Sequence, residues 1–410
     1  MKRVGVVASH PVQYQAPWYR ALAERCRLEV LYCHRQDAAG QAAAGFGEGF
    51  EWDTPLLDGY SFRWLRNVAR EPSVDRFSGC DTPEIRQALA DGGFDACIVN
   101  GWYLKSYLQA FHACRRLGIP VLSRGDSQLG GPRSSLTRAA KYLPYRWLLS
   151  RIDGHLYVGA ANRVYLEHYG VEPCRLFFVP HFVDTTWFNA ESAAARRDGR
   201  AAALRTRLGL REGAEVALFA GKLIEKKRPA DFVAGVSRLA SAGRSVQGVL
   251  VGSGALEAEL RALARSLDAP VVFAGFRNQS EMPSCYALAD VLVLPSDGRE
   301  TWGLVANEAL ACGVSVVLSA AVGSARDLAD GDRAGFAYPC GDVPRLAETI
   351  AAALDARRRA PEATQDAISH TLERFSQERA VSGTLEALEA VAVMGRPARR
   401  SRAVEAGGRS

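Results

Sequence analysis

The sequence predicts an α/β fold with two doubly wound parallel sheets, one in each half of the chain. Short apolar runs alternate with amphipathic helical patterns, which is typical of parallel strands joined by helices. This alternation ends near Pro180 and restarts at Val216. A length of 410 residues is sufficient for two domains of this kind.

The first half contains five apolar runs that read as buried strands, each followed by a helical pattern or a polar loop. Residues 36–80 show no clear period, so we expect irregular structure there. Together these elements define an N-terminal domain over residues 1–183. We expect strands at 4–9, 28–33, 96–100, 120–123 and 154–158, and helices at 18–25, 83–90, 104–117, 135–150 and 160–169.

The second half repeats the pattern and predicts a domain over residues 213–370. Between the halves, residues 184–212 are expected to form a hinge or linker, because 189–203 are rich in Ala and Arg. A final helix is predicted over 371–394, followed by a disordered tail over 395–410. Strands of the second domain are expected at 216–220, 248–251, 271–274, 291–294 and 315–319.

Residues 291–313 contain the clearest candidate site. A buried strand leads into a loop with Glu300 and then into a helix with Glu308, at the sheet edge where α/β proteins bind ligands. Either glutamate alone is more readily explained as an exposed surface residue. The pair at this spacing, however, offers two carboxylates for hydroxyl groups beside helix-start amides that suit a phosphate. Those amides belong to Gly303, Leu304 and Val305.

The run from Glu300 to Gly313, ETWGLVANEALACG, closely resembles the Glu-to-Glu signature of the family 4 retaining glycosyltransferases, within the glycosyl transferases group 1. The resemblance implies the GT-B fold, in which two Rossmann-like domains face each other across a cleft. It also implies transfer of a sugar from a nucleotide diphosphate sugar to an acceptor hydroxyl with retention. Glu300 would then bind hydroxyls of the donor sugar, and Glu308 would bind the ribose.

A cluster of cations follows the first strand of the second domain, in GKLIEKKRP. On its own this segment is better explained as a solvated basic loop. In the family, cations at the positions of Lys222 and Lys227, after Gly221, grip the donor diphosphate. Lysine replaces the more common arginine at Lys222 and acts as a point charge without bidentate geometry.

Two further strand ends are expected to contact the nucleotide. Gly252 and Ser253 follow the strand at 248–251, where the family places a glycine turn near the nucleotide. A nicotinamide site is disfavoured, because Glu257 takes the place of the third glycine of that fingerprint. Phe276 and Arg277 are expected to line the base pocket, with a plain surface arginine as the alternative for Arg277.

In the first domain, the candidate residues are His10 and Asp126, both in loops at predicted strand ends. His10 could hydrogen-bond a donor phosphate or an acceptor, or it could cap a helix. Asp126 could orient or deprotonate an acceptor hydroxyl, or it could cap a loop. The HPVQY segment that starts at His10 resembles polysaccharide-assembling members. This resemblance implies a glycan or lipid-linked acceptor in cell-envelope or exopolysaccharide biosynthesis.

The composition fits a protein that binds anionic small molecules or an anionic membrane surface, and it gives little support for nucleic acid as a partner, since the net charge is only +6. Residues 133–151 form a basic amphipathic stretch that suits either a membrane surface or a core-facing helix with a charged outer face. We expect cytoplasmic localisation, with the inner face of the plasma membrane as an open alternative, because no signal peptide is evident and the nine cysteines form no C-x-x-C pair.

No metal or cofactor is expected beyond the nucleotide sugar itself. Two alternatives remain open. One is a noncatalytic nucleotide-sugar-binding subunit of a polysaccharide assembly complex, and the other is a different GT-B enzyme such as a nucleotide-sugar epimerase.

Overall fold

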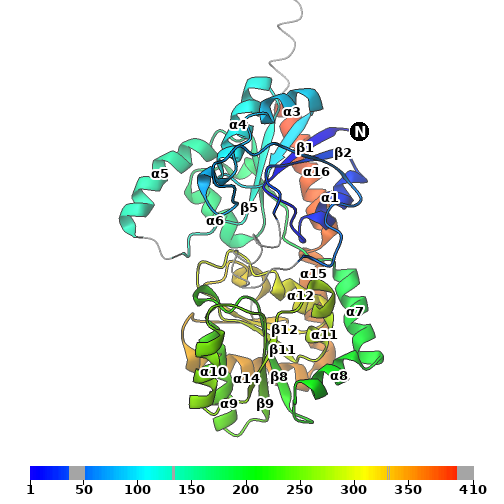
Figure 1. Cartoon of the computed structure of the whole chain (residues 1–410), viewed down its shortest axis with the longest axis vertical. Helices are drawn as coiled ribbons and strands as arrows, with labels where there is room; N and C mark the ends of the chain where they lie inside the picture. Colours follow the sequence, from blue (N-terminus) through cyan, green and yellow to red (C-terminus); the bar gives the residue numbers. More distant parts are fainter. Residues whose placement is uncertain (37–50, 132–133, 330, 332, 395–410) are drawn as a thin grey trace, which may run out of the picture.

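The computed structural model describes residues 1–394 except 37–50, 132–133, 330 and 332. It contains two α/β domains stacked along the long axis of the molecule (Figure 1). The predicted tail at 395–410 lies outside the described residues. Among the helices of the described part, none has the length and apolarity that crossing a lipid bilayer requires.

The first domain is built on a parallel sheet of seven strands in the order β3-β2-β1-β4-β5-β6-β7. Val4 of β1 pairs with Leu28 on one side and with Ala96 on the other, so the strand order reverses direction around β1. The strands are β1 (Arg3–Ala8), β2 (Arg27–Tyr32), β3 (Ser61–Trp64), β4 (Ala96–Val99), β5 (Val121–Gly125), β6 (Gly154–Tyr157) and β7 (Leu176–Phe178).

Helices cover both faces of this sheet. Alternate strand residues point into two different cores: Val6 and Ile98 into one, and Val7 and Val99 into the other. This double burial explains why the central strands read as continuous apolar runs. The helices of this domain are α1 (Ala16–Ala23), α3 (Ile85–Gly92), α4 (Lys105–Leu117), α5 (Ser135–Leu149) and α6 (Ala160–His168), with short 3-10 turns η2 (Phe77–Gly79) and η3 (Pro173–Arg175).

The second domain has a parallel sheet of six strands in the order β10-β9-β8-β11-β12-β13. Its direction reverses between β8 and β11, so the loops after these strands diverge and leave room for a ligand. The strands are β8 (Glu215–Ala220), β9 (Val246–Val251), β10 (Val271–Gly275), β11 (Val291–Leu294), β12 (Ser315–Ser319) and β13 (Gly335–Tyr338).

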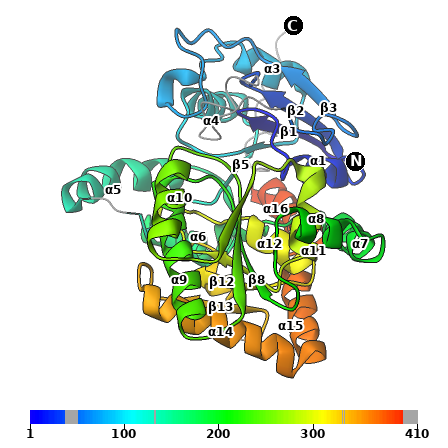
Figure 2. The ribbon, with the colours of Figure 1, turned by 60° about the horizontal axis from the view of Figure 1, so that its bottom comes forward.

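The helices of the second domain also lie on both faces of its sheet (Figure 2). Phe219 and Val293 point into the core beneath α9 and α14, while Leu218 and Leu292 point into the core beneath α11 and α12. The helices are α9 (Pro229–Ser241), α10 (Glu257–Ser266), α11 (Met282–Ala287), α12 (Val305–Ala311), α13 (Ala325–Leu328), α14 (Val343–Arg359) and α15 (Pro361–Arg374), with 3-10 turns η4 (Glu225–Lys227) and η5 (Gln279–Glu281).

Three strands were not predicted: β3, β7 and β13. Each lies at an edge of its sheet and has three or four residues. In β3 three of the four residues are exposed, so no apolar run marks it in the sequence. The prediction of irregular structure over 36–80 was therefore wrong at 61–64, and residues 37–50 lie outside the described part of the chain.

The segment predicted as an exposed linker at 189–203 is helical. It forms α7 (Thr185–Arg197) and α8 (Arg200–Arg207), which pack against α11 of the second domain. Asp184 caps α7 by accepting a hydrogen bond of 2.9 Å from the Trp187 amide. Phe188 is buried in the second-domain core that lies beneath α11 and α12. This burial explains why the alanine-rich stretch is ordered.

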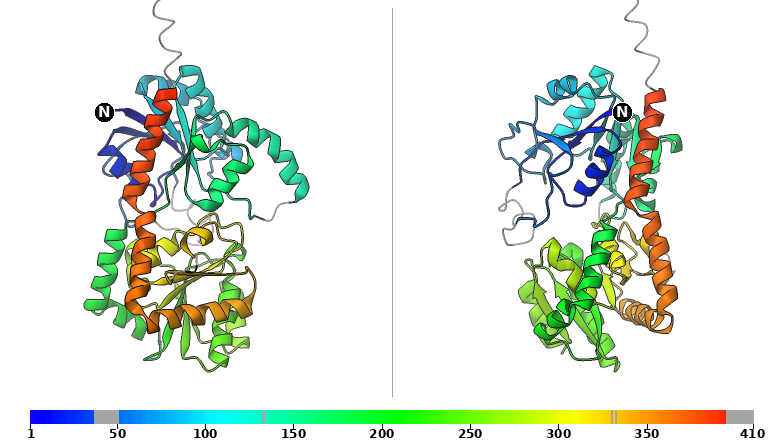
Figure 3. Two further views of the ribbon diagram at one scale, coloured as in Figure 1. Left: turned by 180° about the vertical axis from the view of Figure 1, so that it is seen from behind. Right: turned by 90° about the vertical axis from the view of Figure 1, so that its right-hand side faces the viewer.

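The last helix, α16 (Gln377–Met394), runs back along the first domain (Figure 3). Thr384 accepts a hydrogen bond from the Trp18 indole at 3.2 Å, and the Leu388 carbonyl accepts one from Lys2 at 3.1 Å. The predicted helix over 371–394 is interrupted at Phe375, which is buried between α15 and α16. The two domains are thus joined by two crossings of the chain, one before α7 and one before α16.

Candidate active site between the domains

A cavity of about 300 Å³ lies between the two domains. The loop after β1 contributes Gln13 and Tyr14, and the rest of the lining comes mainly from the carboxyl ends of β8, β9 and β10 and from α12. This is the sheet edge at which open α/β folds bind ligands. The residues of the second domain that line it include Gly221, Lys222, Lys226, Lys227, Gly252, Phe276, Arg277, Gln279, Met282, Val305 and Glu308.

Glu308 is the buried carboxylate of this cavity, with only 2% of its surface exposed. Its Oε1 accepts a hydrogen bond of 3.0 Å from the Tyr14 hydroxyl, and its Oε2 accepts one of 2.6 Å from the Tyr286 hydroxyl. Burial raises the pKa of Glu308 to about 7, although these hydrogen bonds oppose the shift. The side chain is therefore poised between its neutral and ionised forms near neutral pH.

Glu300 is tied to the cation cluster. The Lys227 ammonium lies 2.6 Å from Glu300 Oε2, and both side chains are largely buried. Burial, together with the positive charges of Lys226 and Lys227, lowers the pKa of Lys222. Three lysines at the end of β8 thus form a site of concentrated positive charge, which favours a phosphate ligand.

Glycines let the loops of this cavity come close together. Gly252 has φ of 135°, and a Cβ at this position would lie 2.0 Å from the Gly221 carbonyl oxygen. Gly221 itself has φ of 147°. Gly303, at φ of 88°, would place a Cβ 2.4 Å from the Leu294 side chain. Side chains at these positions would push the loops apart, so the backbone can approach a ligand only because they are absent.

A second cavity, of about 410 Å³, opens at the carboxyl ends of β4 and β5 in the first domain. The Asp126 carboxylate is 43% exposed, and its Oδ2 accepts a hydrogen bond of 2.7 Å from the Thr301 hydroxyl of the second domain. Burial lowers the pKa of His181, whose Nε2 lies 3.9 Å from the same oxygen. Partial burial raises the pKa of Asp126, but the nearby His181 ring and the hydrogen bond from Thr301 outweigh it and lower that pKa overall.

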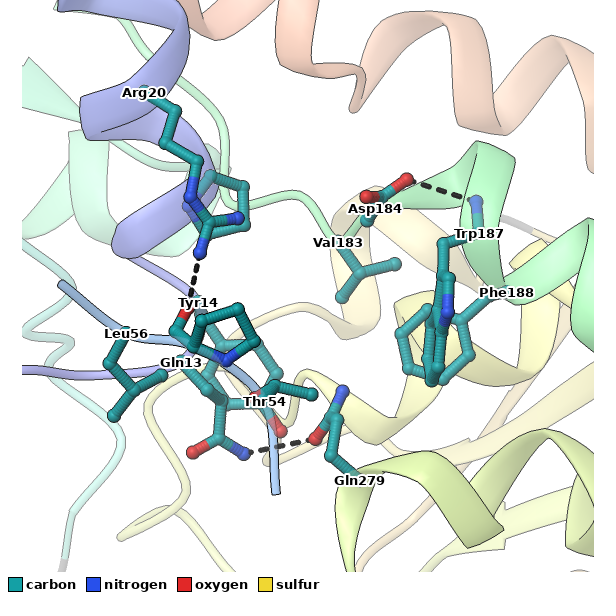
Figure 4. A pocket seen from close by; sticks show the side chains of 12 residues that line it. Gln13, Tyr14, Arg20, Thr54, Leu56, Val183, Asp184, Trp187, Phe188 and Gln279 are labelled. Carbon is teal, nitrogen blue, oxygen red and sulfur yellow. Dashed lines mark hydrogen bonds between the residues drawn. The ribbon is translucent and has the colours of Figure 1, made fainter. Parts of the chain in front are cut away.

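A third, smaller cavity of about 190 Å³ lies beside the chain crossing before α7 (Figure 4). Gln13 of the first domain donates a hydrogen bond of 3.3 Å to Gln279 of the second domain. On the first-domain side of this cavity, Arg20 donates to the Pro55 carbonyl. The cavity adjoins the 300 Å³ cavity through Gln13, Tyr14 and Gln279, which line both.

Gln128 joins the two domains at the loop that carries Glu300. Its Nε2 donates to the Glu300 carbonyl at 2.7 Å and to the carbonyls of Gly298 and Ala321, both at 3.2 Å. One amide of the first domain thereby holds the strand-to-helix loop of the second. The loop that carries Glu300 and the first domain are positioned against each other by this contact and by the hydrogen bond between Asp126 and Thr301.

The sequence model described as "Glycosyl transferases group 1" matches residues 201–371. A D-inositol 3-phosphate glycosyltransferase of Acidothermus cellulolyticus is 30% identical over 320 residues, which cover 73% of this chain and 68% of that protein. The chain belongs to the glycosyl transferases group 1. A protein of the same name from Kineococcus radiotolerans is 37% identical over 187 residues, but the match spans only 43% of this glycosyltransferase and 41% of that relative.

Solved structures confirm that this glycosyltransferase has the GT-B fold. A glycosyltransferase from Rickettsia africae superimposes with a TM-score of 0.70 at 12% identity, covering 95% of this chain and 98% of that one. Anabaena HepE in complex with UDP gives 0.70 at 16% identity, with 95% and 100% coverage. A trehalose 6-phosphate synthase from Burkholderia multivorans gives 0.70 at 14% identity, with 96% and 100% coverage.

Most of the donor-site residues predicted from the sequence of this glycosyltransferase line the 300 Å³ cavity, which is named the donor-side cavity after that prediction. Glu300 is not among the residues that line this cavity, but its carboxylate contacts Lys227, which does line it. Asp126 lines the 410 Å³ cavity instead. Arg277 lines the donor-side cavity and also pairs with Glu281 at 3.0 Å. Those lining the donor-side cavity are Gly221, Lys222, Lys227, Gly252, Phe276, Arg277, Val305 and Glu308.

Other predicted residues are not among those that line these described cavities. His10 Nδ1 lies 2.9 Å from Ser9 Oγ, and burial together with the nearby charge of His34 lowers its pKa to about 4. The alternative of a helix cap at His10 is wrong, because Gln15 is the N-cap residue of α1. Ser253 is buried next to Gly252. Gly303 and Leu304 stand immediately before α12 and position its first turn.

Four residues for which no role was predicted make contacts across or beside the cleft. Tyr14 and Tyr286 hold Glu308, Gln128 holds the Glu300 loop, and Gln279 bridges to Gln13. Tyr14 stands in the HPVQY segment, so its place in the first strand-to-helix loop was the available signal. Tyr286 and Gln128 lie in ordinary helix and loop patterns, and nothing in these patterns signals a functional role.

Proposed function

We propose that this glycosyltransferase transfers a sugar from a nucleotide diphosphate sugar to a hydroxyl of a glycan or lipid-linked acceptor, with retention at the anomeric carbon. The observation that carries the proposal is the convergence of Lys222, Lys227 and Glu308 on one interdomain cavity, with Glu300 paired to Lys227. Two carboxylates for hydroxyl groups and two cations for a diphosphate match the chemistry of such a donor. The resemblance to family 4 supports retention.

We propose one order for the groups of the donor along this cavity. Phe276 and Arg277 would contact the base, and Glu308 would accept hydrogen bonds from the ribose hydroxyls. Lys222 and Lys227 would neutralise the diphosphate, and Glu300 would bind the hydroxyls of the sugar. A uridine nucleotide is the first donor to test, because Anabaena HepE, of similar fold, is described in complex with UDP and with UDP-glucose.

The reaction depends on stabilising the leaving diphosphate. Negative charge grows on it as the bond to the sugar breaks, and the Lys222 and Lys227 ammonium groups would meet that charge in a site already arranged for it. Losing one such donor typically costs about 3 kcal/mol, or roughly a hundredfold in rate. Because the cations are supplied by the chain, we propose that no metal ion is required. A phosphate oxygen would take the acceptor proton on the same face of the sugar.

The acceptor would enter from the 410 Å³ cavity. Asp126 lies there with its carboxylate accessible, and the aromatic rings of Tyr103 and Tyr145 provide surfaces on which a sugar ring can stack. Asp126 would orient the acceptor hydroxyl. We place this activity in cell-envelope or exopolysaccharide biosynthesis, in the cytoplasm and at the inner face of the plasma membrane.

The test is a thermal-shift titration of the purified chain with UDP-, GDP-, ADP- and dTDP-sugars, with EDTA present and then with Mg²⁺. A donor at about a hundred times its dissociation constant should add roughly 2.7 kcal/mol to the free energy of unfolding. The shift should vanish in Glu308→Ala and persist in the matched control Glu348→Ala, which alters an exposed glutamate of α14. No shift with any nucleotide sugar would contradict the proposal.

Turnover is tested separately with the donor that binds. Lys227→Met should lower the transfer rate about a hundredfold, while Arg345→Met, at an exposed ion pair, should leave it unchanged. The anomeric configuration of the product, read by NMR, should be that of the donor. Donor binding without transfer to any glycan or lipid-linked acceptor would favour a noncatalytic nucleotide-sugar-binding subunit.

A further inference from the structure

Helix α5 (Ser135–Leu149) projects from the side of the first domain (Figures 1 and 2). Three of its large apolar side chains face solvent: Leu136 is 83% exposed, Leu143 is 71% exposed and Trp147 is 59% exposed. Their spacing of seven and four residues places them on one face of the helix. The alternative considered from the sequence, a core-facing helix with a charged outer face, is right about the inner face, where Leu149 is buried, but the outer face also carries these three apolar side chains.

The surroundings of this apolar face are exclusively basic in sequence. No acidic residue occurs between Asp126 and Asp153. The described cations of that segment are Arg138, Lys141, Arg146 and Arg151. Arg151 stacks on Trp147, with its guanidinium carbon 4.2 Å from the ring centre. The exposed face thus combines Leu and Trp side chains with Arg151 at its margin, beside a helix whose charged residues are also cations.

The opposite face of α5 reaches the proposed acceptor site. The rings of Tyr142 and Tyr145 pack on Tyr169 with centroid distances of 5.9 and 5.5 Å. Lys141 and Tyr145 line the 410 Å³ cavity that also contains Asp126. The same helix therefore borders the acceptor cavity on one side and offers an apolar, basic face to its surroundings on the other.

We infer that α5 docks on an anionic lipid surface through the face formed by Leu136, Leu143 and Trp147, with Arg151 stacked on Trp147 and the exposed Arg138 on the same projecting helix. Apolar residues with Trp on one face and cations beside them are the pattern of helices that lie in the membrane interface. Docking there would bring the acceptor cavity to the bilayer surface, where a lipid-linked acceptor resides. Only this last step rests on the proposed function; the docking itself does not.

Charge favours lipid over the other partners that an apolar helix face can have. Each cation near an anionic bilayer adds about fivefold to partitioning, so the basic side chains would act together with the apolar contacts. A second copy of the same face would set these cations against one another. Self-association through α5 is therefore disfavoured, and it becomes an outcome of the test.

The experiment is co-sedimentation of the full chain with vesicles of phosphatidylcholine alone, or of phosphatidylcholine and phosphatidylglycerol in equal parts, without nucleotide. We expect binding to the anionic vesicles only, and weaker binding at high salt. Leu143→Gln/Trp147→Gln should weaken binding at least tenfold. The matched control Leu267→Gln, at an exposed leucine of the second domain, should bind as the wild type does.

A charge variant, Arg138→Gln/Arg151→Gln, provides a second test should the apolar variant fold poorly, and it should weaken binding about 25-fold. The wild type failing to bind anionic vesicles at low salt would overturn the inference, as would binding unchanged in both variants. A wild-type dimer in solution that becomes monomeric in Leu143→Gln/Trp147→Gln would assign the face to self-association instead. Donor-induced thermal shifts, measured on the same samples, report the proposed function independently.

Discussion

Glu308 lies at the centre of the donor-side cavity, and its two carboxylate oxygens are held by tyrosines from different domains. A buried carboxylate is stable only when hydrogen-bond donors replace its lost water. Tyr14 and Tyr286 supply them, and both hydroxyls have their own pKa raised by burial and by the nearby Glu308 charge. These tyrosines therefore remain donors throughout the neutral pH range.

The raised pKa of Glu308 predicts a pH dependence of stability. Since the folded protein holds this proton up to a pH of about 7, the stabilisation is complete below the ordinary glutamate pKa and is lost as pH rises towards 7. Relative to Glu308→Gln, the wild type should lose about 3 kcal/mol between pH 4.5 and 8. Urea unfolding of both proteins at several pH values measures this difference, with Glu348→Gln as the exposed control. Parallel pH profiles for the wild type and Glu308→Gln would contradict the shift.

At the scale of elements, the donor-side cavity is formed by strand-end loops that contact one another through glycines. The turn after β9 lies against the turn after β8, with Gly252 over the Gly221 carbonyl. Neither loop can adopt this arrangement with a Cβ at position 252, because backbone atoms cannot move aside as a flexible side chain can. The position of Lys222 in the lining of this cavity depends on this contact.

Gly252→Ala should therefore reduce both stability and donor binding. A strained positive φ alone costs on the order of 1 kcal/mol, and the overlap with the Gly221 carbonyl adds displacement of the loop that carries Lys222. The matched control is Gly213→Ala, at φ of 72° with no atom within 4 Å of its added Cβ, where only the backbone strain remains. Thermal unfolding and donor titration measure the two effects. Equal behaviour of the two variants would show that the loop contact does not matter.

At the scale of the whole molecule, two kinds of contact determine how the domains face each other. Polar side chains join the loops around the cleft, as Gln128 and Asp126 do with residues 298–301. On the opposite side of the first domain, α16 returns from the second domain and buries Ala380, Ala387 and Leu388 in the first core. The second domain is thereby anchored to the first by a helix whose sequence lies beyond both sheets.

Leu388→Ala should destabilise the first domain although it lies outside that domain in sequence. A buried leucine reduced to alanine in a packed core costs about 2–5 kcal/mol. Val393→Ala, on the same helix at an exposed position, should change stability by less than about 0.5 kcal/mol. Chemical unfolding followed by tryptophan fluorescence measures the difference. Similar effects of the two variants would mean that α16 is not packed on the first domain in solution.

Much of the fold could be predicted from the sequence because it is encoded locally. The central strands are buried on both faces, so β11 and β12 appear as continuous apolar runs with the bounds that the structure gives them. The edge strand β3 was not predicted because its exposed residues leave no such run, and β7 and β13 are only three and four residues long. The segment at 189–203 was misjudged because small alanines pack closely without any strong apolar period.

What the sequence by itself determined is the family signature: the spacing of Glu300 and Glu308, the lysines after β8 and the glycines at the strand ends. All of these lie in one domain, in strand-end loops or, for Glu308, in the helix that follows such a loop. Only the tertiary structure decided the contacts between domains. Tyr14 meets Glu308 across 294 residues of chain, and Asp126 meets Thr301 across 175. The exposure of the apolar face of α5 was likewise settled by packing. Periodicity reports which face of an element is apolar, whereas the neighbour that covers or leaves that face depends on how distant elements stack.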